Sequence, residues 1–500
     1  MTEAIDFVNG FVWSKALIYL CLGAGLYFSI RTRFVQVRAF RDMLRLTFSG
    51  KQSEAGVSSF QALAMSLSGR IGIGNIAGVA TAITFGGPGA ILWMWVVAFL
   101  GASTAYVEST LAQIYKEKDA NGQYRGGPAY YIEKAMGRKW YAIIFALTTV
   151  LATGLLLPGV QANGIAVSVH NAWGVPTTVS AALIVIALGA IIFGGVKRIA
   201  AFAQIVVPFM ALAYILTALV IMLINIEQIP AVFALIVRSA FGAEAAFGAV
   251  LGLAVEWGVK RGVYSNEAGQ GTGPHAAAAA EVSHPAKQGL VQAFSIYVDT
   301  LLVCSATAFM ILSTGAYNVR RPDGSMIVTG LPGAETGPAY TQAAVEGVMP
   351  GFGASFVALA LMFFAFTTIV AYYYMADTNV QYVSRHMQRG WATFLLKVAI
   401  MVSVTYGAVR SANAAWALGD IGVGLMAWLN IVAILVLHKP ALVALRDYEA
   451  QKRAGVDPVF DPRRLGIQNA ELWSGFGGAC EPAEATDSSE SATRPVASPP

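Results

Sequence analysis

Long apolar segments separated by short polar loops run along most of this chain. A transmembrane helix needs roughly 20 mostly apolar residues in a row. Segments of about that length occupy eleven ranges, at 11–30, 58–83, 89–115, 140–167, 178–195, 199–225, 242–259, 288–314, 351–376, 391–409 and 413–437. The pattern therefore predicts an all-α, polytopic membrane protein with about eleven transmembrane helices.

Composition points to the bilayer as the solvent of this protein. Of its 500 residues, 56% are hydrophobic and only 12% are charged, whereas about 25% of the residues of soluble domains are charged. The net charge of +5 is spread over many loops, so it does not indicate a nucleic-acid surface. Cysteines at 21, 304 and 480 are too far apart to indicate a CxxC metal site or a disulfide framework. The first residues lack the basic region of a cleaved signal peptide, so we expect segment 11–30 to remain as a helix.

Lysine and arginine orient the spans, because short cytoplasmic loops retain positive charge. With the N-terminus outside, 26 of the 33 basic residues fall in inner loops or in the C-terminal tail, and the opposite orientation would reverse this ratio. The exceptions are Lys15, Arg238, Arg320, Arg321 and Arg410 outside, and Arg70 and Lys397 within spans. The charge pattern predicts an N-out, C-in topology.

Three segments outside the spans have patterns of their own. Residues 33–48 alternate apolar and basic positions, which suits either a helix lying in the inner interface or a solvated loop. The outer loop 315–350 is rich in Gly and Pro, and its TGPAYTQAAVEG run could form a short lid helix. Beyond about residue 475 the tail is low in complexity, and we expect disorder there.

Candidate chemistry lies in the second span, at residues 68–78 (SGRIGIGNIAG). An ionised Arg at a helix centre costs about 2.5–3.5 kcal/mol on insertion scales, so Arg70 should face protein or water. The glycines favour an unwound stretch, whose freed amides suit a carboxylate and whose freed carbonyls suit sodium. The alternative is a packing seam formed by Gly74 and Gly78 at GxxxG spacing. A dinucleotide fingerprint at 72–77 is excluded, because no strand precedes it and no acidic residue follows about 20 positions later.

A binding site between inverted repeats predicts a second interrupted helix at the matching position. When the first span is set aside, the sixth of the remaining ten begins with FGAEAAFG at 241–248 and continues to Gly252. This segment combines glycines with a carboxylate, Glu244, and we expect the second break there. The two interrupted helices are then the first and the sixth of ten, which is the pairing that a five-plus-five inverted repeat requires. The alternative is an ordinary helix preceded by a surface loop, with Glu244 outside the membrane.

Three longer motifs resemble the alanine or glycine:cation symporter family, the sodium:alanine symporters. They are GNIAGVATAI at 74–83, GGPGAILWMW at 86–95 and GVKRGVYSNEAG at 258–269, and the similarity extends over about 55–437. The resemblance implies the amino acid–polyamine–organocation superfamily and the bacterial leucine transporter fold, with two five-helix inverted repeats and here one extra N-terminal helix. We therefore expect an N-terminal helix with a basic interfacial segment, a first repeat, a second repeat and a cytoplasmic tail at 1–55, 56–227, 228–438 and 439–500.

The resemblance also implies a binding site made largely of backbone at the turn between Gly69 and Asn75. The residues expected to bind substrate are Gly72, Ile73, Gly74, Gln161, Phe247 and Gly248. Those expected to bind sodium are Ser68, Ile71, Asn75, Thr367 and Thr368. Without the family, Gln161 would be a buried glutamine bonded to a neighbouring helix, and the threonine pair would bond back to its own helix.

Two positions depart from the family pattern. Many members have Thr where this chain has Ile73, so one hydroxyl near the substrate is lost. The loop at 269–273 reads GQGTG where Met and Ser are common. Because of these departures, the resemblance supports the transport mechanism more strongly than it supports the identity of the substrate.

Other ionisable residues lie within or at the ends of spans, where they are functional by default. Asp299 could bind a cation, relay a proton or form an interhelical hydrogen bond, and Glu108 is a similar candidate. Asp377 is expected at an inner interface. The segment 265–267 (SNE) is expected at the cytoplasmic mouth, either as part of a gate that pairs with basic residues of the 116–139 loop or in a purely folding role.

Together these features predict a multi-pass transporter of the bacterial inner membrane that carries a small neutral amino acid such as alanine or glycine with Na⁺ by alternating access. The first rival is a proton-coupled symporter with Asp299 or Glu256 as the relay. A membrane enzyme or channel is a second rival, but the chain has no HExxH, GxSxG or phosphate loop. A third is a sensor that binds alanine without net flux.

Overall fold

The computed structural model describes residues 2–48, 56–385 and 390–473, and most of them are helical. Within this part, eight helices are long and apolar enough to cross a membrane: Phe7–Arg31, Ala90–Ile114, Lys139–Trp173, Lys197–Ile224, Pro285–Thr314, Gly353–Val383, Gly390–Val409 and Ala412–Arg453. The architecture is that of a mostly helical, multi-pass membrane protein. The disorder expected beyond about residue 475 concerns residues outside the described ranges.

These eight spans consist of α- and π-helical elements that follow one another with little interruption. The elements are α1 (Thr2–Val12), α2 (Lys15–Arg31), α7 (Ala90–Ile114), α9 (Lys139–Leu151), η2 (Ala152–Leu156), α10 (Leu157–Trp173), α12 (Gly195–Ile224), α16 (Pro285–Ile296), η5 (Tyr297–Cys304), α17 (Ser305–Thr314), α19 (Gly353–Val383), α20 (Gly390–Val409) and α21 (Ala412–Arg453). The wider turns η2 and η5 are π-helices, which occur mostly as short bulges and frequently at functional sites.

The three other predicted segments are shorter or interrupted. One is a single helix, α11 (Thr177–Ile192). The second span of the sequence consists of α5 (Ser59–Arg70), a break, the π-helix η1 (Gly74–Gly78) and α6 (Val79–Gly86). The seventh consists of α14 (Leu251–Asn266), a break, and α15 (Gly273–Ala279).

The connecting segments contain short elements. They are α3 (Val35–Arg38), α4 (Phe40–Phe48), β1 (Glu117–Lys118), β2 (Tyr124–Arg125), α8 (Pro128–Met136), η3 (Ile226–Gln228), α13 (Ile229–Ala240), η4 (Ala245–Val250), β3 (Asn318–Arg320), β4 (Met326–Thr329) and α18 (Pro338–Val348). The strands form two antiparallel pairs, β1 with β2 and β3 with β4. The helical form of 33–48 is therefore the one found, and the predicted short helix of the outer loop is present as α18.

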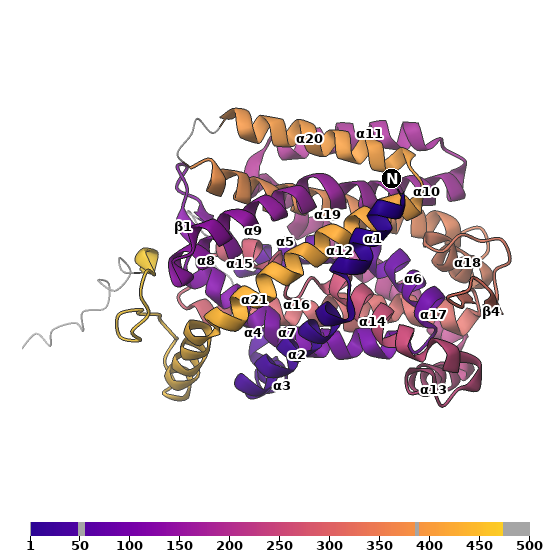
Figure 1. The fold of residues 1–500 in the computed structure, drawn as a ribbon, viewed down its shortest axis with the longest axis horizontal. Coiled ribbons are helices and arrows are strands. Elements are labelled where there is room, and N and C mark those ends of the chain that lie inside the picture. The colour runs from indigo at the N-terminus through magenta and orange to yellow at the C-terminus, as the bar shows by residue number, and fades with distance from the viewer. Residues whose placement is uncertain (1, 49–55, 386–389, 474–500) are drawn as a thin grey trace, which may run out of the picture.

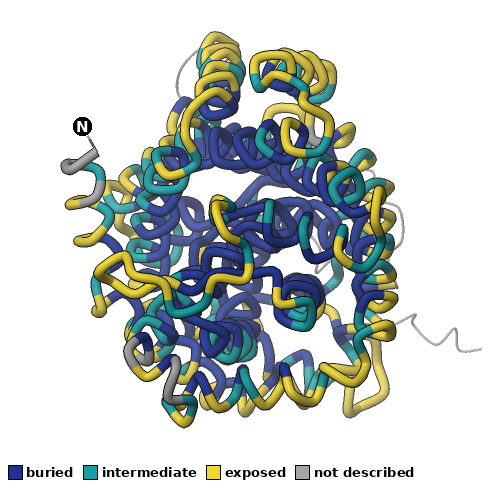
Figure 2. Tube along the Cα trace, turned by 90° about the vertical axis from the view of Figure 1, so that its right-hand side faces the viewer, coloured by how far each residue is buried: buried dark blue, intermediate teal, exposed yellow. Residues whose placement is uncertain are grey.

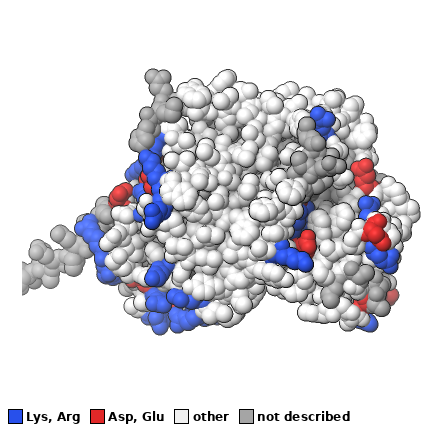
Figure 3. Space-filling view, in the orientation of Figure 1, with Lys and Arg blue, Asp and Glu red and all other residues white. Residues whose placement is uncertain are grey.

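The long helices run side by side and define two ends of the molecule. Figure 1 shows β1 and α8 at one end, hereafter the β1 end, and α13, α18 and β4 at the other, hereafter the α18 end. Seen along this direction, buried residues form the middle and exposed residues lie mostly at the rim (Figure 2). On the face shown in Figure 3, Lys and Arg gather near α3 and the last turns of α21, and a largely uncharged surface extends from there.

The break after α5 has a clear local cause. Helix α5 begins with a capping box, in which the Ser58 hydroxyl accepts the Gln61 amide proton (3.2 Å) and the Gln61 side chain accepts that of Ser58 (3.0 Å). The helix ends at Arg70, and Ile71 is extended, with ψ 91°. The chain re-enters a helix at Gly74 through the wide turn of η1. The break that the glycines predict is therefore present.

The second break lies at a different place from the one predicted. Residues 241–248 follow α13 and form a turn and the beginning of η4. The interruption comes after α14 instead, where Glu267 has a φ of 58° and the two glycines of the 269–271 turn each have a φ of 84°. A helix commonly ends on a left-handed residue of this kind, usually glycine. The second break is thus at 267–272.

Candidate functional site

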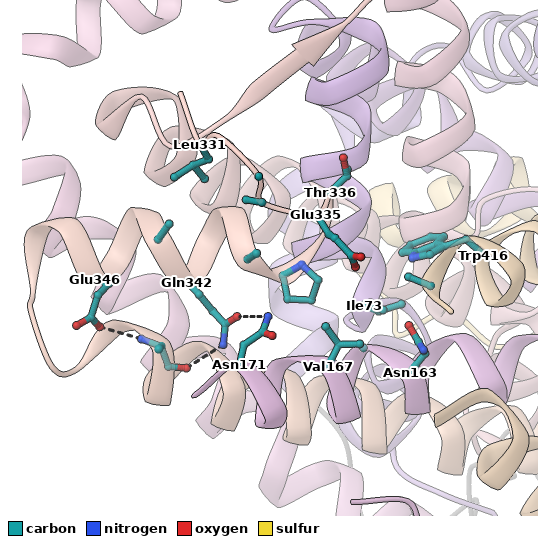
Figure 4. A pocket seen from close by; sticks show the side chains of 18 residues that line it. Ile73, Asn163, Val167, Asn171, Leu331, Glu335, Thr336, Gln342, Glu346 and Trp416 are labelled. Atoms are coloured by element: carbon teal, nitrogen blue, oxygen red, sulfur yellow. Dashed lines mark hydrogen bonds between the residues drawn. The ribbon is translucent and has the colours of Figure 1, made fainter. Parts of the chain in front are cut away.

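A cavity of about 600 Å³ opens between the α18 end and the α5 break. It is lined by α10, by the segment before α18, by α18 itself and by the first turns of α21, and we call it the vestibule (Figure 4). Asn171 donates to the Gln342 side chain (3.2 Å), which ties α10 to α18. The backbone amides of Gly351 and Ala354 hold the pKa of the Glu346 carboxyl below its usual range. These contacts fix α18 along one wall of the vestibule.

Ile73 lies at the deep end of the vestibule, where the chain leaves the break. Figure 4 shows its side chain near those of Trp416 and Asn163. Ile73 is only 1% exposed, and its side chain packs so closely on Gly164 of α10 that a Cβ at position 164 would clash with it. Ile73 and Gly164 therefore close the floor of the vestibule above the break.

The backbone directly beneath this floor is held by two side-chain amides. The Ile73 N–H donates to Gln161 Oε1 (3.0 Å), and the Gly72 N–H donates to Asn75 Oδ1 (2.8 Å). A Cβ at Gly72 would lie 2.6 Å from the Thr368 hydroxyl oxygen and 2.8 Å from Gln161 Oε1, so only glycine fits between them. The break thus brings backbone amides and side-chain oxygens together in the interior.

Carbonyl and hydroxyl oxygens also gather beside Gly72. The Thr368 hydroxyl has the carbonyl oxygens of Ser68 (2.8 Å), Ile71 (3.3 Å) and Phe364 (3.0 Å) within hydrogen-bond distance as acceptors for its single proton. The Thr367 hydroxyl also donates to the Phe364 carbonyl (2.9 Å). All five residues are described, and both threonines are buried. We call this group the oxygen cluster: two hydroxyls and three carbonyls without a formal charge.

A buried carboxylate lies on the opposite side of the break. Asn75 Nδ2 donates to Asp299 Oδ1 (2.6 Å), and the Ser265 hydroxyl donates to Asp299 Oδ2 (2.9 Å). Thr300 also donates to Asp299 Oδ2 (2.7 Å). Asp299 belongs to the π-helix η5 and is fully buried. It is the carboxyl group that the described chain places in contact with Asn75 of the break.

The two interrupted helices meet at Gly74. A Cβ there would lie 3.2 Å from the Tyr264 ring and 3.3 Å from Ser265 Cα, at the end of α14. One turn earlier, Arg261 makes two hydrogen bonds to the Asp420 carboxylate of α21 (2.9 and 2.8 Å), and its guanidinium lies 4.6 Å from the centre of the Trp416 ring. This ion pair ties α14 to α21 beside the vestibule floor. The orientation by charge had placed Arg261 in an inner loop. The structure places it within α14 instead.

The β1 end of the break is closed by backbone contacts. The Val57 N–H donates to the Ala279 carbonyl (3.0 Å), and the Glu281 N–H donates to the Val57 carbonyl (3.0 Å), so the chain before α5 pairs with the end of α15. Lys116, after α7, donates to the Ala280 carbonyl (2.6 Å). The break is therefore reached from the α18 end as far as Ile73, and it is shut off from the β1 end.

The structure brings most of the expected site residues to one place. Those around the break are Ser68, Ile71, Gly72, Ile73, Gly74, Asn75, Gln161, Thr367 and Thr368. Phe247 and Gly248 are not among them. Phe247 packs near Gly87, about 20 Å along the helix from Gly74 at 1.5 Å per residue. Gly248 is exposed, with nothing within 4 Å of a Cβ placed on it.

The remaining ionisable candidates lie in different surroundings. Glu108 is buried and accepts from the Gly269 N–H (3.3 Å) and from Asn430 (2.7 Å). Asp377 forms an ion pair with Arg125 (3.0 Å). Glu256 is only partly buried and lies near Lys260. Segment 265–267, which was expected at the cytoplasmic mouth, is fully buried beside the α5 break.

Sequence reasoning missed several residues that shape this region. Trp416 and Asp420 give no local signal, because a tryptophan and a carboxylate on an apolar helix are recognisable as partners of Arg261 only after folding. The Phe364 carbonyl is a backbone group that any residue could supply. The glycines after Glu267 were a usable signal, since turns of this kind favour glycine.

Comparison with known proteins identifies relatives over most of the chain. A sequence model of the sodium:alanine symporter family matches residues 1–462. A sodium/proton-dependent alanine carrier protein of Bacillus sp. (strain PS3) is 56% identical over 86% of this chain and 97% of its own length. The sodium/alanine symporter AgcS of Methanococcus maripaludis is 38% identical over 87% of this chain and 94% of its own. A solved structure of a manganese transporter of Eremococcus coleocola has a similar fold, with a TM-score of 0.50 at 12% identity, over 84% of this chain and 91% of that one.

Proposed function

Because this chain belongs to the sodium:alanine symporter family, we propose that it is a secondary active transporter that carries alanine, or a similarly small neutral amino acid, into the cell together with Na⁺. The observation that carries the proposal is the juxtaposition at the α5 break. Unwound backbone amides lie beneath the vestibule floor, and an uncharged oxygen cluster lies beside Gly72. The family and its named relatives are transporters and not enzymes.

The membrane topology follows from the distribution of charge. Basic residues gather near α3 and the end of α21, and short cytoplasmic loops retain such residues. The β1 end then faces the cytoplasm, the α18 end faces outward, and the N-terminus lies outside. With α11 and the two interrupted helices counted as spans, the chain crosses the membrane eleven times. After one N-terminal span, the chain would divide into inverted repeats at 56–227 and 228–438, followed by a cytoplasmic tail from 439.

The substrate would bind between the α5 break and the end of α14. Its carboxylate would lie at the start of η1, near Gly72, Ile73 and Gly74, where the helix dipole favours a negative charge. Its ammonium group would face the side-chain oxygen of Gln161. Ile73 takes the space into which a substrate side chain would extend, which supports a small substrate. We leave Phe247 and Gly248 out of this site because they lie near the α18 end.

Sodium would occupy the oxygen cluster. Neutral oxygens suit a hard cation that must bind reversibly. The carbonyls of Ser68 and Ile71 and the hydroxyls of Thr367 and Thr368 would supply ligands, and in the absence of the cation the Thr368 proton fills the same position. Asn75 would support the ion indirectly, because its Oδ1 already holds the Gly72 amide. One ion is accommodated by this cluster.

Alternating access would follow from the two closures around the break. The described conformation is open to the outside as far as Ile73 and closed on the inside by the Val57–Ala279 pairing. Binding of Na⁺ would draw α5 and α19 together, because its ligands come from both. Substrate and cation would then stabilise one another's bound states, which is the coupling free energy of symport.

A proton in place of Na⁺, or in addition to it, is the second candidate for coupling. The relative from Bacillus sp. is named sodium/proton-dependent, and Asp299 is a buried carboxyl group in contact with Asn75. The partly buried position of Glu256 does not support it as the relay.

The test is uptake of radiolabelled alanine by proteoliposomes containing the purified chain. An inward Na⁺ gradient should drive alanine above its external concentration, and replacement of Na⁺ by K⁺ should abolish this accumulation. Accumulation that ignores Na⁺ and follows an inward proton gradient would replace the sodium proposal with the second candidate. Alanine binding without any accumulation would indicate a sensor.

A further inference from the structure

Two opposite charges are buried at the two helix breaks without pairing. Arg70 is the last residue of α5, Glu267 is the residue that ends α14, and they are 2% and 1% exposed. A Cβ on Gly69 would lie 3.3 Å from Glu267 Oε2, so the carboxylate faces the α5 break. Neither residue has an ion-pair partner in the described chain, and Arg70 instead donates to Gln292 Oε1 (3.4 Å) and to the Ser295 hydroxyl.

The surroundings of this pair are polar and unpartnered. Neither oxygen of the Glu267 carboxylate has a hydrogen-bond partner in the described chain, and the same holds for Nε and Nη2 of Arg70. Further buried polar atoms without a partner lie on nearby residues, namely Ser66 Oγ, Asn266 Nδ2, Gln270 Oε1, Thr272 Oγ1 and Gln292 Nε2. Buried polar groups in proteins nearly always have partners, because leaving one unsatisfied costs about 1–3 kcal/mol. A concentration of such groups marks a place where the protein handles a polar ligand.

The charges that face Glu267 come from several elements. Arg70 of α5 is positive; Glu108 of α7 and Asp299 of η5 are carboxylates, and Tyr264 of α14 and Tyr372 of α19 also lie close. With all three carboxyl groups ionised, one arginine would face three negative charges in the membrane interior. Glu267 also stands at the C-terminal end of α14, where the helix dipole disfavours a negative charge. The region therefore has an excess of negative charge that one proton would relieve.

Of the three carboxyl groups, Glu267 is the one whose oxygens accept no hydrogen bond in the described chain. Asp299 accepts from Asn75, Ser265 and Thr300. Glu108 accepts from Asn430 and from the Gly269 amide. Donors of this kind stabilise the ionised form. The Thr272 and Tyr372 hydroxyls lie close to Glu267, but neither reaches hydrogen-bond geometry within the described chain. A bound proton is therefore best placed on Glu267.

A side-chain connection leads from Glu267 to the proposed substrate site. The Tyr372 hydroxyl lies close to both Gln161 and Glu267. Gln161 in turn accepts the Ile73 amide at the floor of the vestibule. Binding of a substrate against Gln161 would thus act on the neighbour of Glu267.

We propose that Glu267 takes up one proton in each transport cycle and that this proton crosses the membrane with alanine and Na⁺. The inference rests on the proposed symport function and adds the site of a second coupling ion. The proton comes from outer water while the break is accessible from the vestibule and converts the carboxylate to a carboxylic acid. It returns to cytoplasmic water when α5 and α15 separate, and the carboxylate is restored. No other bond forms or breaks.

The experiment uses proteoliposomes that contain the full chain and a trapped pH-sensitive dye, with equal Na⁺ on both sides and the membrane potential clamped by K⁺ and valinomycin. External alanine should acidify the lumen with the wild-type protein. Glu267→Gln should lower this acidification to the level of protein-free vesicles, whereas Glu267→Asp should retain part of it. The matched control is Glu256→Gln, the same change on the same helix at a partly buried position away from the break, and it should behave like the wild type.

Outcomes separate this inference from the proposed function. Na⁺-driven alanine uptake by wild-type vesicles without any acidification would overturn the proton site and leave sodium symport standing. Acidification by Glu267→Gln equal to that of the wild type would assign the proton elsewhere. If Glu267→Gln transports nothing, infrared difference spectra of the purified variant decide. The protonated-carboxyl band that alanine and Na⁺ change in the wild type should be absent from Glu267→Gln and present in Glu256→Gln, and its persistence in Glu267→Gln would contradict the proposal.

Discussion

Removal of the Thr368 hydroxyl should weaken sodium binding more than any other change at a single side-chain atom. This oxygen lies 2.8, 3.3 and 3.0 Å from the carbonyl oxygens of Ser68, Ile71 and Phe364. It therefore sits where α5 and α19 contribute to the same cluster. A cation bound there would lose one of the four proposed oxygen ligands in Thr368→Ala.

The size of the effect follows from the strength of polar contacts to a charge. A hydrogen bond to a charged group contributes about 1.5–3 kcal/mol, and we take a similar value for one neutral oxygen on Na⁺. Since about 1.4 kcal/mol corresponds to a tenfold change, the Na⁺ concentration for half-maximal alanine uptake should rise about 10- to 150-fold. The alanine concentration for half-maximal uptake at saturating Na⁺ should change much less, because the Thr368 hydroxyl bonds to backbone carbonyls, whereas the proposed substrate contacts are backbone amides and Gln161.

The assay is initial alanine uptake by proteoliposomes over a range of external Na⁺. Thr368→Val removes the oxygen but keeps the shape and should resemble Thr368→Ala, while Thr368→Ser keeps the oxygen and should stay near the wild type. If both oxygen-free variants show wild-type sodium dependence, the oxygen cluster is not the cation site. If Thr368→Ser is as impaired as Thr368→Ala, the residue acts through packing.

Three further changes probe the rest of the site. Gly72→Ala would place a Cβ 2.6 Å from the Thr368 hydroxyl and 2.8 Å from the Gln161 amide oxygen. Since overpacking costs about 1–3 kcal/mol, alanine uptake should be lost. Gly248→Ala, whose Cβ meets nothing within 4 Å, should transport normally. Asp420→Asn leaves the buried Arg261 without its charge partner, which costs about 3–5 kcal/mol, so the unfolding temperature of the purified protein should fall; an unchanged temperature would contradict the role of this ion pair. A cysteine in place of Ala339, on α18 in the vestibule, should react with a membrane-impermeant maleimide added outside intact cells. A cysteine in place of Ala120, between β1 and β2, should not react. The reverse pattern would show that the proposed topology is inverted.

Much of the fold was predictable because apolar length is a local property. Segments such as 89–115 and 351–376 correspond closely to Ala90–Ile114 and to the first part of Gly353–Val383. The break of the sixth core helix was predicted at the wrong place for a physical reason. Its polar continuation, SNEAGQGTG, resembles a surface loop, and its burial depends on Glu108 and Asn430, which come from distant parts of the chain. One signal was available: α14 has 16 residues and rises only about 24 Å, too little for a core about 30 Å thick.

The candidate site was predictable to the same limited extent. The first break could be located because its glycines, Arg70 and Asn75 lie within ten positions, 69–78. Gln161 and Thr368 came from resemblance to a family, since a lone glutamine or a Thr-Thr pair has many roles. The Glu267 environment could not be anticipated, because the absence of partners around a carboxylate is a property of the folded chain.

Coupling itself is tested most directly by using the alanine gradient, instead of the sodium gradient, as the driving force. Proteoliposomes with equal Na⁺ on both sides receive an inward gradient of alanine alone, and the entry of radioactive sodium is measured. Sodium should enter in response to alanine, stop when the alanine gradient has decayed, and fail to enter with Thr368→Ala at the same Na⁺ concentration. Alanine entry with no movement of sodium would contradict sodium symport by this protein.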